Sequence, residues 1–147
     1  MQVGYGFAEG DDLALRQSKR SNVNEIFKLD GEARWRELEI MVAKKLRTAD
    51  KTIIATGGGA VMNQIIFTYL KQQPNTIVVY LAAKFSTVQR RLRGDKTRPL
   101  FQNIQKARAL YELREPLYRH YADITVNTDR RALDSIVKDT IGKLKNL

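Results

Sequence analysis

Residues 52–61 constrain the fold of this chain more than any other stretch. Residues 52–55 are β-branched or apolar, and Gly57, Gly58 and Gly59 follow them almost at once. A short apolar run bounded by such breakers predicts a buried strand. Three consecutive glycines leave bare backbone that a ligand can approach closely, although a tight turn would also explain them. Because α/β proteins bind ligands at the carboxyl ends of parallel strands, we expect a binding site here.

Strands and helices are predicted to alternate along the chain. Residues 76–81 share the apolar character of residues 52–55, and an amphipathic stretch lies between them. Strand, helix and strand in this order indicate a βαβ unit, which implies a parallel sheet with a right-handed crossover. Further strands are expected at residues 5–8 and 123–126, and helices near residues 13–15, 23–27, 30–47, 63–72, 85–92, 106–121 and 130–145.

Apolar side chains recur at helical spacing in three of these helices, the ones at residues 30–47, 63–72 and 130–145. Such a stripe marks the side of a helix that packs against a core. The inward faces are expected to comprise Trp35, Leu38, Val42 and Leu46 in the first helix, Ile65, Ile66, Tyr69 and Leu70 in the second, and Leu133, Ile136, Val137, Ile141 and Leu144 in the third.

Acidic residues stand where two helices are expected to begin. Asp11 and Asp12 directly precede residues 13–15, and Asp30 precedes Glu32. Short acidic side chains at these positions favour N-caps, and a glutamate in the first turn suits the helix dipole. For Asp11 and Asp12 a role in holding a substrate or a metal ion is the alternative.

The composition limits the class of protein. The 147 residues suit one domain, residues 1–147, with no linker that would divide it. The absence of cysteine excludes disulfides and thiolate chemistry. No apolar run is long enough to span a bilayer and residues 1–4 do not open a signal peptide, so we expect a soluble, intracellular protein. The net charge of +10 suits nucleic acid, phosphates or carboxylates as partners.

Basic residues are prominent in two further places. Residues 94–105 form a polar, basic segment with a central proline, which is typical of a functional lid or a linker. Arg36 precedes Glu39 by three residues in a predicted helix, and this spacing favours an exposed ion pair. Arg114 lies in the helix predicted at residues 106–121, where an ordinary surface charge is the simplest interpretation.

Five groups of residues resemble the motifs of the shikimate kinase family, in the family's order and at matching spacing. The likeness covers residues 12–127. The groups are Glu25-Ile26-Phe27 with Asp30-Gly31-Glu32 and Trp35-Arg36, then Gly57-Gly58-Gly59-Ala60-Val61, Thr97-Arg98-Pro99-Leu100, Arg114-Glu115-Pro116-Leu117-Tyr118, and Asp123-Ile124-Thr125-Val126-Asn127-Thr128.

This resemblance implies an α/β fold of the P-loop kinase type, in which a parallel sheet lies between two layers of helices (a three-layer α/β/α arrangement). In the family this sheet has five strands. It implies transfer of the γ-phosphoryl group of ATP, with Mg²⁺, to the 3-hydroxyl of shikimate, a step in the biosynthesis of aromatic amino acids. The expected protein is a cytoplasmic monomer whose partners are shikimate and ATP, with no nucleic acid and no membrane.

The resemblance also implies which residues bind shikimate. Asp12 matches the aspartate that holds the substrate hydroxyls and orients the attacking one; with a one-residue slip in the alignment, Asp11 takes this place. Arg36 and Arg114 match the two arginines that grip the substrate carboxylate, and Gly58 matches a backbone contact to the substrate. Arginine suits this task because its planar donors bind a carboxylate in two places.

Two further arginines are assigned to the nucleotide by the same resemblance. Arg98 matches the arginine that a closing lid, at about residues 94–105, brings onto the phosphates; such a cation suits phosphoryl transfer. Arg91 lies where the family places an arginine against adenine. No metal ligand is assigned, because the first aspartate of the family's acidic pair is replaced by Gly10 when the alignment has no gap.

The family's opening motif is not found among these residues. No G-x-x-x-x-G-K-[ST] occurs, and the only Gly-Lys pair, Gly142-Lys143, lies in the last predicted helix. The resemblance therefore implies that the first strand, the P-loop and the first helix are missing from this chain, and with them the main cradle for phosphates and Mg²⁺. Because that strand is central in the family's order, the sheet is expected to be open.

Three functions remain in competition. A shikimate kinase is favoured, although activity of these 147 residues alone is in question because the P-loop is missing. The alternative is a non-catalytic relative that binds shikimate or has a regulatory role. A basic nucleic-acid-binding domain ranks lowest, because the arginines stand at motif positions and no known reader motif is present.

Overall fold

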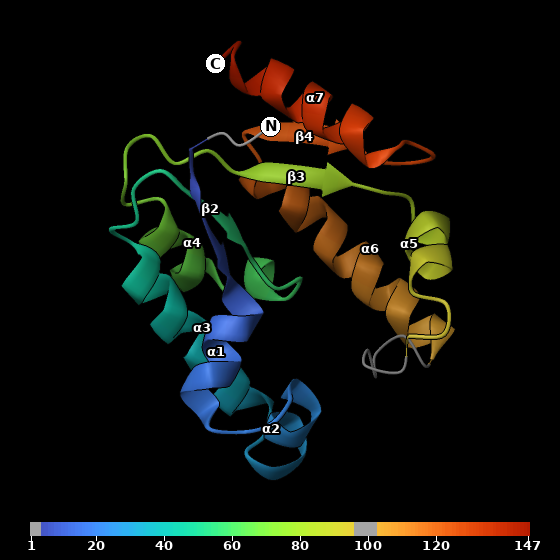
Figure 1. The fold of residues 1–147 in the computed structure, drawn as a ribbon. Coiled ribbons are helices and arrows are strands. Elements are labelled where there is room, and N and C mark those ends of the chain that lie inside the picture. The colour runs from blue at the N-terminus through green and yellow to red at the C-terminus, as the bar shows by residue number, and fades with distance from the viewer. Residues whose placement is uncertain (1–3, 96–102) are drawn as a thin grey trace. The chain divides into compact units, whose positions relative to one another are not determined.

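The computed structural model describes residues 4–95 and 103–147 of the chain. The chain divides into two compact units, Met1–Thr76 and Ile77–Leu147. Each unit has its own two-stranded parallel sheet (Figure 1). The expectation of one domain over residues 1–147 stays a prediction.

The described part of the first unit combines one strand pair with four α-helices and one 3-10 turn. Strand β1 pairs with β2 in parallel, with Gly6 opposite Thr52 and Glu9 opposite Ala55. The elements follow in the order β1 (Gly6–Glu9), α1 (Gly10–Ser18), α2 (Val23–Leu29), α3 (Glu32–Leu46), β2 (Thr52–Ala55), the 3-10 turn η1 (Ala60–Met62) and α4 (Gln64–Leu70).

The core of this unit lies where α1, α2 and α3 meet. Ile26 and Leu38 are completely buried, and Trp35 and Val42 are nearly so. These side chains form one cluster with Ala14, and Leu46 packs against it. The predicted stripe of the helix at residues 30–47 is therefore confirmed. Burying each of its larger side chains contributes about 1.5–3 kcal/mol.

The predicted acidic N-caps are wrong. Helix α1 begins at Gly10, so Asp11 and Asp12 lie in its first turn, where their charges suit the helix dipole. Asp30 ends α2 instead of starting α3, because Gly31 takes the capping place with a φ of 85° that disfavours residues with a side chain. The predicted place of Glu32 in the first turn of α3 is confirmed.

The predicted inward face of α4 is only partly correct. Ile66 and Phe67 are buried, whereas Ile65 is 51% exposed. Helix α4 is short, and Asn63 caps it by accepting a hydrogen bond from the N–H of Ile65 at 3.1 Å. Ile66 and Phe67 thus form the buried side of α4, and Tyr69 and Leu70 are half-buried.

The second unit contains β3 (Val79–Ala82), α5 (Phe85–Arg91), α6 (Ile104–Tyr121), β4 (Ile124–Asn127) and α7 (Leu133–Leu144). Strands β3 and β4 are parallel, and α6 and α7 lie on opposite sides of the pair (Figure 1). The Tyr80 ring stacks on Tyr118 of α6 at 5.1 Å, and Lys143 of α7 donates to the carbonyl of Thr125 at 2.8 Å.

The apolar face predicted for residues 130–145 is less buried than expected. No residue of α7 is fully buried, and Leu133 is 74% exposed. The sheet beside it has two strands, which lie about 5 Å apart. Such a sheet is too narrow to cover the apolar side of a helix about 10 Å wide.

The sheets confirm parallel pairing but correct the predicted βαβ unit. In the described residues β2 pairs with β1 and β3 pairs with β4, and no pairing joins β2 to β3. Parallel strands with helices are consistent with the α/β class. The expectation of an open sheet stays a prediction.

Most of the predicted lid at residues 94–105 lies outside the described residues. At its ends, Gly94 has a φ of 83°, and Asn103 caps α6 by accepting a hydrogen bond from the N–H of Lys106 at 3.0 Å. Helix α6 therefore begins at Ile104, two residues earlier than predicted.

Candidate functional site

The three glycines after β2 lie between an aspartate and an arginine. A Cβ atom at Gly57 would lie 3.1 Å from Cγ of Asp11 and closer still to one of its oxygens. A Cβ atom at Gly59 would lie 3.0 Å from Cζ of Arg36 and closer still to Nη1. Neither glycine has a positive φ. Both positions are therefore small because charged groups approach the backbone, not because the backbone conformation requires glycine.

The glycine segment also makes a turn, as the alternative interpretation predicts. The N–H of Ala60 donates to the carbonyl of Gly57 at 3.0 Å, and the N–H of Met62 donates to Gly59 at 3.0 Å. These hydrogen bonds form a turn that connects β2 to η1. The turn and the close approach of Asp11 and Arg36 thus occur in the same few residues.

Arg36 is held on α3 by two carboxylates of the same helix. Its Nη1 lies 2.7 Å from Glu39 and its Nη2 lies 3.0 Å from Glu32. The predicted pairing with Glu39 is confirmed, but it is not an exposed pair, because the Glu39 side chain is only 8% exposed. Burial opposes the charge of Arg36, yet the hydrogen bonds and charges of Glu39 and Glu32 raise its pKa above the ordinary value. Arg36 is therefore a fixed, permanent cation beside Gly59.

The structure distinguishes the two aspartates of α1 by position. Asp11 lies against Gly57 and is half-buried, whereas Asp12 is exposed. Both belong to the first turn of α1, directly after β1. Asp11 is thus the carboxylate that the fold brings to the glycine segment, on the opposite side from Arg36.

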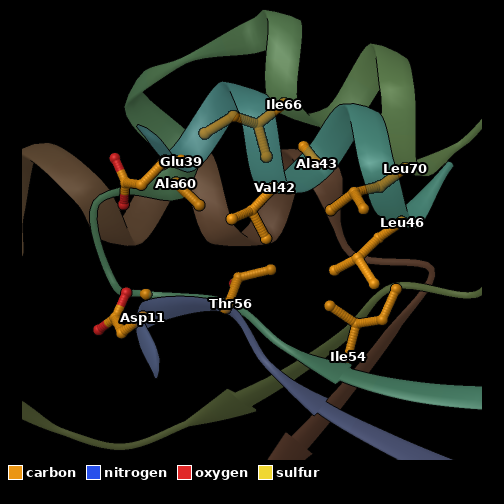
Figure 2. Close-up of a pocket in the computed structure, with 12 residues that line it drawn as sticks. Asp11, Glu39, Val42, Ala43, Leu46, Ile54, Thr56, Ala60, Ile66 and Leu70 are labelled. Atoms are coloured by element: carbon orange, nitrogen blue, oxygen red, sulfur yellow. The ribbon is translucent and has the colours of Figure 1, made fainter. Parts of the chain in front are cut away.

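A small cavity extends from this place into the first unit. Its volume is about 30 Å³, room for about one water molecule. Asp11 and Glu39 lie at one end and the aliphatic side chains of Ile54, Leu46 and Leu70 at the other (Figure 2). Asp11 and Gly57 thus line the polar end of this cavity, beside the glycine segment.

Arg91, at the end of α5, is fixed by the residue that follows β4. Its Nη1 donates to Oγ1 of Thr128 at 3.1 Å and its Nη2 to the carbonyl of Thr128 at 2.7 Å. The next residue, Asp129, accepts hydrogen bonds from the N–H of Lys84 and from the Thr87 hydroxyl, which is the main cause of its lowered pKa. The turn after β4 is thus joined to both ends of α5.

Arg114, on α6, is not an ordinary surface charge. It is half-buried, and its Nε is buried with no hydrogen-bond partner in the described part of the chain. Burial raises the pKa of the neighbouring Tyr118 hydroxyl, and the charge and hydrogen bond of Arg114 partly offset that rise. An uncompensated Nε–H group is costly when buried, and a bound anion would satisfy it.

The predicted site residues thus fall into three groups. Arg36 and the segment with Gly58 lie together in the first unit, with Asp12 one residue from Asp11. Arg91 and Arg114 belong to the second unit. Arg98 lies outside the described residues. Sequence reasoning did not identify Glu39 as a buried partner, although its spacing from Arg36 gave the pairing. Thr128 was part of the fifth motif group, but nothing in the sequence connected it with Arg91.

Two features of the described residues concern the binding of a metal ion and of phosphate. The described residues contain no cluster of three or more histidine, cysteine or acidic residues that could hold a metal. The first helix after Gly4 and Gly6 in the chain is α1, whose first turn carries Asp11 and Asp12. These carboxylates oppose phosphate at a helix start that would otherwise attract it. Among the described helices, none has the length and apolar character needed to cross a membrane.

The family model for shikimate kinase matches residues 1–145. The chain belongs to the shikimate kinase family. A shikimate kinase of Thiobacillus denitrificans is 38% identical over 122 residues, which are 81% of this chain and 66% of that protein. A shikimate kinase of Burkholderia lata is 39% identical over 142 residues, 95% of this chain and 75% of the relative. The chain therefore spans about two thirds to three quarters of these relatives.

Solved structures of the same family have a similar fold. The shikimate kinase from Acinetobacter baumannii in complex with shikimate matches with a TM-score of 0.85 and 34% identity, over 97% of this chain and 80% of that one. The enzyme from Aquifex aeolicus matches with a TM-score of 0.81 and 27% identity, over 97% and 83%. These matches confirm the predicted family and the α/β fold of the P-loop kinase type.

Proposed function

We propose that this protein acts as a shikimate kinase, which transfers the γ-phosphoryl group of ATP to the 3-hydroxyl of shikimate. One observation carries the proposal. In a chain whose residues 1–145 match the family, an aspartate and an arginine stand on either side of three glycines at the end of a parallel strand. Carboxylate, guanidinium and bare backbone are the groups that a small hydroxylated acid requires.

The substrate side is assigned to five residues. Arg36 and Arg114 bind the shikimate carboxylate, since a planar guanidinium can hold both of its oxygens. Gly58 contacts the substrate through its backbone. Asp12, or Asp11 as the geometry favours, holds the hydroxyls and orients the attacking one. The buried Glu39 keeps Arg36 charged and in place before the substrate arrives.

The nucleotide side is assigned to Arg98, which the lid would bring onto the phosphates, and to Arg91, which would meet the adenine. Mg²⁺ would neutralise the phosphate charges of ATP, and no described residue is assigned to it. The proposed setting is the one that the family resemblance implies, a cytoplasmic monomer whose partners are shikimate and ATP.

The proposal is tested by measuring binding and turnover separately. Calorimetry on the 147-residue chain is expected to detect shikimate, and Arg36→Ala is expected to abolish the heat signal. Arg34→Ala is the matched control, because Arg34 also pairs with a glutamate three residues on but is exposed. A phosphoryl-transfer assay with ATP and Mg²⁺, with the Acinetobacter baumannii enzyme as positive control, then tests catalysis.

The two measurements distinguish the competing functions. Turnover that depends on Arg36 supports the kinase. Shikimate binding without turnover supports the non-catalytic relative instead. Absence of shikimate binding in the wild-type chain would contradict both functions.

A further inference from the structure

Thr128, the residue directly after β4, is buried, with 4% of its surface exposed. Its hydroxyl donates to the carbonyl of Ala82 at 3.0 Å, and its backbone N–H donates to the same carbonyl at 2.8 Å. A hydroxyl has one proton to donate, and this proton is used at Ala82. The lone pairs of Oγ1 are therefore left to accept from a donor, and that donor is Arg91.

Arg91 is held along one edge of its guanidinium group. Nη1 meets Oγ1 and Nη2 meets the carbonyl oxygen of Thr128, at 3.1 and 2.7 Å. Two bonds to one rigid residue fix the plane of the group. Edge contacts leave the flat faces for stacking, which is how a guanidinium meets an aromatic ring. Arg91 is exposed, so a ligand can reach it.

We propose that Thr128 is a positioning residue for the nucleotide, which fixes the plane of Arg91 so that its face is ready to stack on the purine base. This inference rests on the proposed function, which assigns Arg91 to the nucleotide. An arginine held before binding loses less conformational freedom when the ligand arrives, and the affinity rises accordingly. Thr128 acts through Arg91 and touches no ligand itself.

The test is an NMR titration of the full chain with ADP, followed to millimolar concentrations. Thr128→Val keeps the shape of the side chain but removes the hydroxyl, and it is expected to weaken ADP binding about three- to tenfold. Thr128→Ser restores the hydroxyl and is expected to restore the affinity. In combination with Arg91→Ala, Thr128→Val is expected to cause no further loss, because its effect passes through Arg91.

Two controls separate positioning from a general loss of structure. Thr140→Val removes another threonine hydroxyl of the same unit, which donates to Ile136 at 2.8 Å and has no bond to Arg91; ADP affinity should not change. Inorganic pyrophosphate, which has no base, should bind wild type and Thr128→Val equally. If Thr128→Val does not fold, Arg91→Lys replaces it in the test. A lysine cannot bond Thr128 through two separate nitrogens, so Arg91→Lys is expected to weaken ADP binding by the same factor.

The outcomes distinguish this inference from the proposed function. Weaker ADP binding by Arg91→Ala with unchanged binding by Thr128→Val, or by Arg91→Lys, would overturn the role of Thr128 alone. The role of Thr128 would also be overturned if Thr128→Val and Arg91→Ala each weakened ADP binding and their effects were additive in the double variant. Unchanged ADP binding by Arg91→Ala, or no ADP binding by the wild type, would overturn both the inference and the assignment of Arg91 in the proposed function.

Discussion

At the scale of single residues, Gly59 shows how space for the site is made. A side chain there would meet the Arg36 guanidinium, whereas the backbone (φ −82°, ψ −10°) suits any residue. Gly59→Ala should therefore displace Arg36 without straining the chain. We expect shikimate affinity to fall about tenfold or more, because the charge-assisted bonds to the carboxylate are worth about 1.5–3 kcal/mol. Calorimetry measures the affinity, and urea unfolding measures the stability.

Gly142→Ala is the matched control for that prediction. Gly142 lies inside α7, and a Cβ atom there would have nothing within 4 Å. Alanine should stabilise the helix by about 0.5–1 kcal/mol and leave shikimate binding unchanged. Wild-type affinity in Gly59→Ala would show that Arg36 does not need its present position.

Arg36 itself provides a second prediction at this scale. Arg36→Lys keeps the charge but replaces a fork, which bonds Glu32 and Glu39 through separate nitrogens, by a single ammonium group. We expect shikimate to bind about tenfold more weakly. Arg34→Lys, in the exposed pair with Glu37, should have no effect on the affinity. Equal affinities of the two variants would exclude a carboxylate-gripping role for Arg36.

At the scale of elements, one ion pair joins the end of α1 to the turn between α2 and α3. Nε and Nη2 of Arg20 lie 2.8 and 2.7 Å from the two oxygens of Asp30. The hydrogen bond from Arg20 is the main cause that lowers the pKa of Asp30 below 3.8. The Arg20–Asp30 pair therefore stabilises the folded state fully at a pH above the unfolded-state pKa of Asp30. This stabilisation is lost as the pH falls through the lower pKa that Asp30 has in the folded state.

Arg20→Gln should consequently lower the free energy of unfolding at neutral pH, and the difference from wild type should shrink as the pH falls below 3.8. Urea unfolding at a series of pH values measures this difference. Arg34→Gln, which removes an ion pair within α3, is the control and should show a smaller effect at neutral pH. If the difference in unfolding free energy between Arg20→Gln and wild type stayed constant at acidic pH, the role given to Asp30 would be contradicted.

The helices and strands were largely predictable because their signals are local. The stripe of Trp35, Leu38 and Val42 specified the buried side of α3. Helix starts were less predictable, because Gly31 with its positive φ, not Asp30, occupies the cap. The pairing of β2 was not predictable from its own residues, since pairing depends on which strand lies beside it.

The site was predictable only where its residues are near in sequence. Arg36 and Glu39 are one helical turn apart, so their pairing followed from spacing, although the burial of Glu39 depends on tertiary packing. Arg91 and Thr128 are 37 residues apart, and no local pattern connects them. Motif resemblance named Arg91 because it ligates in the family, whereas Thr128 has its effect through a neighbour.

At the scale of the whole molecule, the net charge of +10 makes every anion a potential partner. Salt distinguishes a local site from a diffuse positive surface. Shikimate carries one carboxylate, so its affinity should fall by no more than about fourfold between about 50 and 200 mM salt. A DNA duplex that contacts six or more phosphates should lose about a thousandfold over the same range. Calorimetry for shikimate and fluorescence anisotropy for DNA measure the two slopes. If instead the affinity for shikimate fell as steeply with salt as the affinity for DNA, the carboxylate would be held by the overall positive charge of the protein. Specific binding of the carboxylate by Arg36, beside Gly59, would then be excluded.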